Sequence, residues 1–413
     1  FFGQHGRVRA PWPSAFECQQ DMMYDSRAHV AVYAIITLFL VTAWYMGRRR
    51  AETTQEQCPK EATRSVTLWR LQSAAAKETE KPNSWVYDTT GSAVDLQGVQ
   101  DNVVVVLEDK CKECIELFLL SALAHLSPKT DILLCTSIGR RDDFQNYVSE
   151  LSVSPATAQV YLLFLNFSEY TISRLPPAAK RFFVYKDVLR TYRNRYHHAL
   201  LVDGRDVVFQ ADPFENIINN AISFYREKHT MLEVSSSAAV LRYCFPLEYA
   251  KYKAAWAHWR IVCSGIIAGA VHGLLDILSL QTTRLANAGE GCMKNMLPGM
   301  VANTQHMIDQ IALNVVLVTK KDPERQIQIL SPPTAPVIHM AGWSIPCYRW
   351  RSGLWISPWG HAPAILHQYD RHPALYFYYH AQYNITRLPW RSSLHNHMTV
   401  DYWESYRGAM RSR

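Results

Sequence analysis

The sequence predicts an α/β domain built on a largely parallel sheet, and two observations carry this prediction. Continuous apolar runs, typical of strands covered on both faces, alternate with segments in which apolar residues keep helical spacing. Such alternation of strands and helices is typical of parallel sheets. The chain of 413 residues is also 48% hydrophobic and 12% aromatic, which suffices for a core that folds without a disulfide or metal.

Four strands are predicted in the first half of this domain, each from a short apolar run. They are Val103–Leu107, Asp131–Thr136, Val160–Leu165 and His198–Val202. Apolar residues keep helical spacing from Cys111 to Leu126, which predicts a helix after the first strand. The fourth strand ends in acidic residues, and ligands of open α/β sheets gather at the carboxyl ends of strands.

The second half of the domain is predicted to begin with helical stretches after Phe214. Strands are then expected near Met231–Val234 and Ala238–Leu241. Helical spacing predicts a helix from Ala270 to Leu280.

Residues 28–47 are predicted to form a single transmembrane helix. Within them, Val30–Met46 carries no formal charge, and its length approaches the ~20 residues that span a bilayer core. Trp44 and Tyr45 lie where an interfacial aromatic belt is expected. The other predicted parts are an N-terminal segment, a stalk, the α/β domain and an aromatic, basic tail, at residues 1–27, 48–100, 101–380 and 381–413.

The charges that flank this helix predict its orientation. Arg48, Arg49 and Arg50 follow it, whereas acidic residues dominate the side before it. Positive flanks remain on the side from which a membrane protein inserts. The domain is therefore predicted to face the cytosol, or the matrix if the membrane is the mitochondrial inner membrane. A Golgi or other endomembrane location, with the opposite orientation, is the alternative.

Net charge and cysteine spacing bound the function further. A charge of +7 and a pI near 8.8 suit an anionic small ligand such as a nucleotide diphosphate. The basic residues are spread along the chain, which argues against nucleic acid as a partner. The nine cysteines show no disulfide framework, and Cys111 and Cys114 are interpreted as two thiols at the start of a helix.

The most informative segment is LVDGRDVVFQADPF, at Leu201–Phe214. A buried strand here runs into a turn that carries Asp203 and Asp206. Two carboxylates at a strand end can share a hard divalent cation whose remaining ligands are diphosphate oxygens. Gly204 allows a tight turn, and Arg205 can pair with a phosphate or a neighbouring carboxylate.

This segment resembles a family of GT-A-fold glycosyltransferase-like proteins, whose members read close to D-x-R-D-V-x-F-Q-x-(D/N)-P-F. Three further segments match motifs of that family in the expected order: Cys263–Gly269 matches C-S-G-x-x-x-G, Asp309–Asn314 matches D-Q-x-x-x-N, and His367–Arg371 matches H-Q-Y-D-R. The resemblance covers residues 101–373. It implies a GT-A, Rossmann-like fold, a nucleotide-diphosphate sugar as donor, and Mn²⁺ or Mg²⁺ as cofactor.

The resemblance implies that Asp203 and Asp206 bind the metal ion and the diphosphate, with a histidine late in the chain as a third ligand. His367 is the first choice because its motif is longer. His339 is the alternative, since glycogenin-like enzymes place a ligand in H-x-x-G and this sequence has His-Met-Ala-Gly there. A neutral imidazole suits an oxygen-rich site.

The same resemblance assigns the residues around the sugar. Ser264 and Gly265 are expected to lie where the donor or the acceptor binds. Asp309 and Gln310 are expected beside the anomeric carbon of the sugar.

Two functions follow from these predictions. The first is metal-dependent transfer of a sugar from a nucleotide-diphosphate donor to a glycan, protein or lipid. The alternative is a catalytically idle GT-A-fold accessory subunit of a membrane complex, for example in the mitochondrial inner membrane, with other subunits as partners. A lectin-like binding module is a third and weaker hypothesis.

Overall fold

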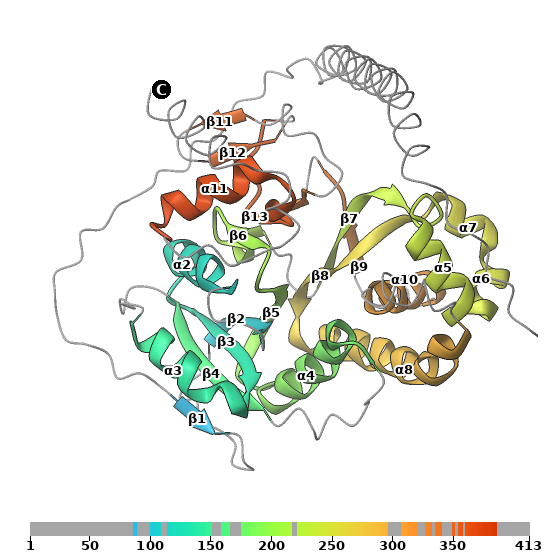
Figure 1. Ribbon diagram of the computed structural model, residues 1–413, viewed down its shortest axis with the longest axis horizontal. Coiled ribbons are helices and arrows are strands. Elements are labelled where there is room, and N and C mark those ends of the chain that lie inside the picture. The colour runs from blue at the N-terminus through green and yellow to red at the C-terminus, as the bar shows by residue number, and fades with distance from the viewer. Residues whose placement is uncertain are drawn as a thin grey trace, which may run out of the picture. The chain divides into compact units, whose positions relative to one another are not determined.

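The chain forms a mixed, mostly parallel sheet that is flanked by helices (Figure 1). Eight strands lie in the order β1–β4–β3–β2–β5–β8–β7–β9, and neighbours are parallel except around β8, which runs antiparallel to both β5 and β7. In chain order these strands are β1 (Val86–Asp88), β2 (Gln100–Leu107), β3 (Thr130–Ser137), β4 (Gln159–Leu165), β5 (Tyr196–Asp203), β7 (Ile222–Thr230), β8 (Arg260–Ala270) and β9 (Ile327–Leu330).

The computed structural model describes residues 86–88, 100–108, 114–150, 158–165, 175–216, 221–295, 307–320, 327–332, 335–340, 349–351, 354–357 and 360–385. Strand β1 belongs to the segment predicted as a stalk and pairs with β4. The predicted transmembrane helix at 28–47, the segment at 1–27 and the tail after residue 385 lie outside the described residues. Within the described residues, no helix has the length and apolar character that a membrane span requires.

Successive residues of β2 face opposite sides of the sheet, as the pleat of a strand requires. Val103 and Val105 are fully buried in the core on the side of α4, whereas Val104 and Val106 are fully buried on the side of α2 and α3 (Figure 1). The helices on the two sides are α2 (Glu116–His125), α3 (Arg141–Glu150), α4 (Pro177–Thr191), α5 (Ser235–Cys244), α8 (Val271–Asn295) and α10 (Ile308–Thr319).

A second, three-stranded sheet brings late parts of the chain beside the end of β5. Its order is β10–β13–β6, with β10 parallel and β6 antiparallel to β13. The register places His339 opposite His367, and His367 opposite Val207. The remaining elements, with the strands of this sheet, are β6 (Val207–Phe209), α6 (Pro246–Lys251), α7 (Lys253–His258), β10 (Val337–His339), β11 (Arg349–Arg351), β12 (Leu354–Ile356), β13 (Ile365–His367) and α11 (Pro373–Gln382).

The strand predictions of the first half are confirmed by β2, β3, β4 and β5, and α2 and α8 confirm the two predicted helices. The prediction for Ala238–Leu241 is wrong, because this segment lies inside helix α5. The strand predicted near Met231–Val234 is also wrong, since β7 ends at Thr230 and a turn follows. Short apolar runs of this kind fit a buried helix as well as a strand.

The cysteine interpretation also needs correction. A disulfide joins Cys244 on α5 to Cys292 on α8, and Cys114 is disulfide-bonded as well. The free cysteines of the described residues are Cys135 and Cys263, both buried.

Asn314, the last residue of the D-Q-x-x-x-N motif, links α10 to the antiparallel strand β8. It is fully buried. Its side-chain oxygen accepts hydrogen bonds from Trp259 Nε1 at 2.7 Å and from the amide of Val262 at 2.9 Å. Its amide nitrogen donates to the carbonyls of Val262 at 2.8 Å and of Gln310 at 2.7 Å. This residue therefore has a structural role that its place in the motif did not indicate.

We expect Asn314→Ala to lower the free energy of unfolding by about 2–4 kcal/mol, because it leaves buried backbone groups without partners. Urea unfolding followed by circular dichroism measures the change. The matched control is Asn287→Ala, an exposed asparagine on α8, which should change the free energy by no more than about 0.5 kcal/mol. Equal effects of the two substitutions would contradict this role.

Candidate functional site

The D-G-R-D turn connects the main sheet to the second sheet. Strand β5 ends at Asp203, and β6 begins directly after Asp206. Gly204 packs against β2, where an added Cβ would lie 2.8 Å from Cγ2 of Val106. The turn therefore needs glycine at this position to bring both aspartates to the carboxyl end of a parallel strand. The side chain of Arg205 is exposed.

The two aspartates differ in their access to solvent. The side chain of Asp203 is 26% exposed, whereas that of Asp206 is 9% exposed. The carbonyl of Asp206 accepts a hydrogen bond from the amide of Gln368 at 2.6 Å. This bond joins the D-G-R-D turn to the H-Q-Y-D-R segment, where Gln368 adopts a left-handed conformation with φ 59°.

His367 faces both aspartates with one ring nitrogen. Its Nε2 lies 3.4 Å from Oδ1 of Asp206 and 3.8 Å from Oδ2 of Asp203. These three residues form a group whose candidate ligand atoms all lie within 4.8 Å of one another. The histidine that completes this group is thus His367, the first choice of the sequence analysis.

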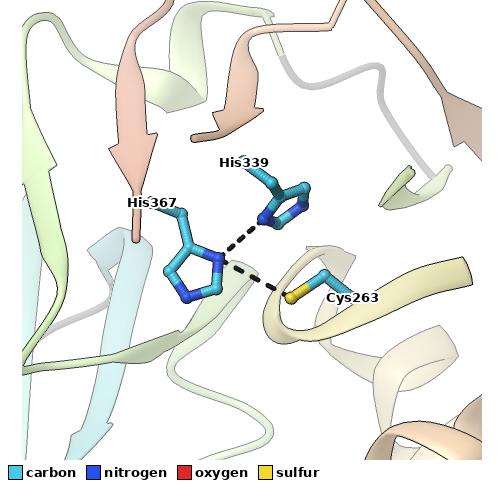
Figure 2. A group of neighbouring side chains, drawn as sticks. All are labelled: Cys263, His339 and His367. Atoms are coloured by element: carbon cyan, nitrogen blue, oxygen red, sulfur yellow. Dashed lines mark hydrogen bonds between the residues drawn. The ribbon is translucent and has the colours of Figure 1, made fainter. Parts of the chain in front are cut away.

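His339 lies on the opposite side of the His367 ring. Its Nδ1 is 2.6 Å from Nδ1 of His367, and the Sγ of Cys263 is 3.6 Å from the same nitrogen (Figure 2). His339 therefore belongs to a second group, formed with Cys263 and His367. The two histidines that were alternatives for one role occupy different positions.

Ser264 and Gly265 lie within strand β8, beside the aspartates. A Cβ on Gly265 would lie 2.6 Å from Oδ2 of Asp203 and 2.6 Å from Cε1 of His367. Only a residue without a side chain leaves these two groups in place.

Asp309 and Gln310 reach the same site from the first turn of α10. The hydroxyl of Ser264 donates to Oδ2 of Asp309 at 2.9 Å, and Oε1 of Gln310 lies 3.5 Å from the amide nitrogen of Ser264. Asp309 is 1% exposed and Gln310 is 8% exposed. All of the residues assigned from the four motifs, apart from the outward-facing Arg205, are thus brought together.

Arg181 is a site residue that the sequence analysis missed. It lies on α4 and forms ion pairs with Asp203 and with Asp309, the latter at 2.9 Å. Its side chain is only 13% exposed. Nothing local in the sequence distinguishes it from the other arginines, because its role arises from the packing of α4 beside β5.

Glu227 on β7 is the second missed residue. Its carboxyl forms hydrogen bonds with the side chains of Cys263 and Gln310. Burial raises the pKa of Glu227 above its ordinary value. Its acidic character is visible in the sequence, but the sequence analysis placed no strand at β7.

The pKa values of two side chains of the site, Asp206 and His339, are shifted from their usual values. Burial opposes ionisation of Asp206, yet His367, Arg371 and Arg205 outweigh it and hold the pKa of Asp206 well below its usual range. Burial, reinforced by His367, keeps the pKa of His339 well below its usual value. Asp206 is therefore an anion and His339 a neutral imidazole at neutral pH.

Gln210 and Asp212, two further polar residues of the first segment, have structural partners. Gln210 donates to the carbonyl of Pro363 at 3.0 Å and accepts from the hydroxyl of Tyr379 at 2.9 Å. Asp212 accepts from the amides of Phe214 at 2.9 Å and Ser127 at 3.0 Å. These residues fix the turn after β6 and take no part in the cluster around His367.

A scan against models of known protein families gives no match for this sequence. A search of curated proteins likewise finds no similar protein.

Proposed function

We propose that this chain is a GT-A-type glycosyltransferase that binds a nucleotide-diphosphate sugar with a divalent cation and transfers the sugar to an acceptor. One observation carries the proposal: Asp203, Asp206 and His367 converge at the carboxyl end of a parallel strand. Asp309 and Gln310 lie next to this cluster through Ser264. Ligands of open α/β sheets bind at such strand ends.

The residues fit a hard divalent cation. Two carboxylates and one imidazole are suitable ligands for Mn²⁺, and Mg²⁺ accepts the carboxylates. Nε2 of His367 is buried and faces the carboxylates of both Asp206 and Asp203, as expected of a nitrogen that binds an ion together with them. When bound, such an ion neutralises charge on the departing nucleotide diphosphate.

The chain itself provides the surroundings for this chemistry. The positive charges of Arg371 and Arg205 favour the ionised form of Asp206. Arg205 is exposed at the turn and is available to pair with a phosphate. Arg181 fixes the carboxylates of Asp203 and Asp309 relative to each other.

The idle accessory subunit is the second candidate, and Arg181 is the observation that favours it. Because Arg181 already pairs with Asp203 and Asp309, both acids have a cationic partner without any metal or donor. Under this hypothesis the fold, the predicted anchor at 28–47 and the stalk serve assembly with other membrane subunits.

The Cys244–Cys292 disulfide bears on the compartment in which the domain lies. Disulfides persist in oxidising compartments and are rare in the cytosol. This bond favours a Golgi or endomembrane lumen, whereas the arginines after the predicted helix favour the cytosol or the mitochondrial matrix.

The decisive experiment measures binding of a panel of uridine and guanosine diphosphate sugars to the full-length chain by calorimetry, with and without Mn²⁺. We expect one donor to bind only with the ion and to be hydrolysed slowly to the free nucleotide diphosphate. If a protein with a cooperative thermal transition binds no donor, the accessory role is the better explanation. Binding without turnover of any tested acceptor would favour the binding module.

A further inference from the structure

Three side chains from three different strands meet at the side of the His367 ring that faces away from the aspartates. They are Cys263 on β8, His339 on β10 and His367 on β13 (Figure 2). Each residue is no more than 2% exposed. Their thiol and imidazole groups offer one ligand atom each, and these atoms all lie within 4.8 Å of one another.

The distances can be compared with those of a tetrahedral zinc site. Bond lengths of about 2.3 Å to sulfur and about 2.0 Å to nitrogen separate S from N by roughly 3.5 Å and N from N by roughly 3.3 Å. Sγ of Cys263 lies 3.6 Å from Nδ1 of His367, which agrees with the first separation. The two Nδ1 atoms are 2.6 Å apart, so the rings must separate by about 0.7 Å to admit an ion.

We propose that Cys263, His339 and His367 form a binding site for a thiophilic divalent metal ion of the zinc class. A thiolate and two imidazoles prefer such an ion to Mg²⁺ or Ca²⁺, whose ligands are oxygens. Three protein ligands leave a fourth position open to water. The proposal goes beyond sugar transfer and does not depend on it.

The second nitrogen of His367 supports this assignment. With Nδ1 bound to the ion, Nε2 carries the proton and faces Oδ1 of Asp206 at 3.4 Å. A ligand histidine that presents its other N–H to a carboxylate is the usual arrangement around zinc. Nε2 cannot then bind a second ion beside Asp203 and Asp206. The zinc-class ion and the manganese ion of the proposed function therefore compete for His367.

The test uses Co²⁺, a spectroscopic substitute for zinc, added to the metal-free full-length chain. We expect an absorption band from thiolate-to-cobalt charge transfer. Cys263→Ser should remove this band, and His339→Ala should weaken Co²⁺ binding at least about 10-fold. The matched control is Cys135→Ser, which alters the other free, buried cysteine of the described residues and should leave the band intact.

A variant of the aspartate cluster distinguishes the two sites experimentally. Asp203→Asn should retain the thiolate band, while loss of Mn²⁺-dependent donor binding in that variant concerns the proposed function alone. A band that survives Cys263→Ser, or no band in folded wild-type protein, overturns the inference. If Cys263→Ser does not fold, X-ray absorption of the zinc-loaded wild-type chain decides, because it must detect a sulfur ligand at about 2.3 Å.

Discussion

The Asp206→Ala variant is expected to lose Mn²⁺-dependent binding of nucleotide sugars by a factor of at least about 100, since even residues that only support a metal ligand cost 10- to 100-fold. Asp206 is the more buried of the two aspartates and lies 3.4 Å from Nε2 of His367. Its substitution removes one proposed ligand and the anion that faces the imidazole. Calorimetry with the donor identified in the panel measures the loss.

Two comparisons make this prediction specific. Asp206→Asn keeps the shape of the side chain but removes its charge, so it should lose binding to a similar extent while changing packing little. Asp142→Ala alters an exposed aspartate on α3 and should bind the donor as the wild type does. If Asp206→Asn retains full Mn²⁺-dependent binding, the proposed metal site is incorrect.

The sequence predicted most of the parallel half of the fold, because buried parallel strands are continuous apolar runs. Val103–Val106 is fully buried on both faces, and few structures other than a buried strand fit such a run. The failures fall where the pattern is ambiguous. Val240 and Leu241 are buried on helix α5, and β7 changes from apolar residues to charged ones after Tyr225, so neither segment carries a clear period.

The residues of the candidate site could be singled out where each belongs to a continuous motif, and they were missed where proximity arises from packing. Asp203 and Gly265 could be singled out from their neighbours in the chain. Arg181 could not, because an arginine on an amphipathic helix is ordinarily solvated and only the position of α4 brings it to two acids. The position of His339 beside Cys263 and Nδ1 of His367 was equally hidden, since the register between β10 and β13 decides which group it faces.

The Gly265→Ala variant is expected to lose donor binding by about 100-fold, because a displacement of catalytic groups by about 1 Å has effects of this size. Its Cβ would lie 2.6 Å from both Oδ2 of Asp203 and Cε1 of His367, well inside van der Waals contact. Strand β8 is fixed between β5 and β7, so the side chains of Asp203 and His367 must move apart. Overpacking of this kind also costs about 1–3 kcal/mol of stability, which urea unfolding measures separately.

The comparison with Gly139→Ala isolates the effect of this contact. An added Cβ at Gly139 meets nothing within 4 Å, so this variant carries the same chemical change without displacing any group. It should bind the donor with wild-type affinity and unfold at a similar urea concentration. A folded Gly265→Ala protein with wild-type affinity would mean that donor binding does not depend on Asp203 and His367 being close together. The absence of a side chain at Gly265 would then reflect strand packing alone.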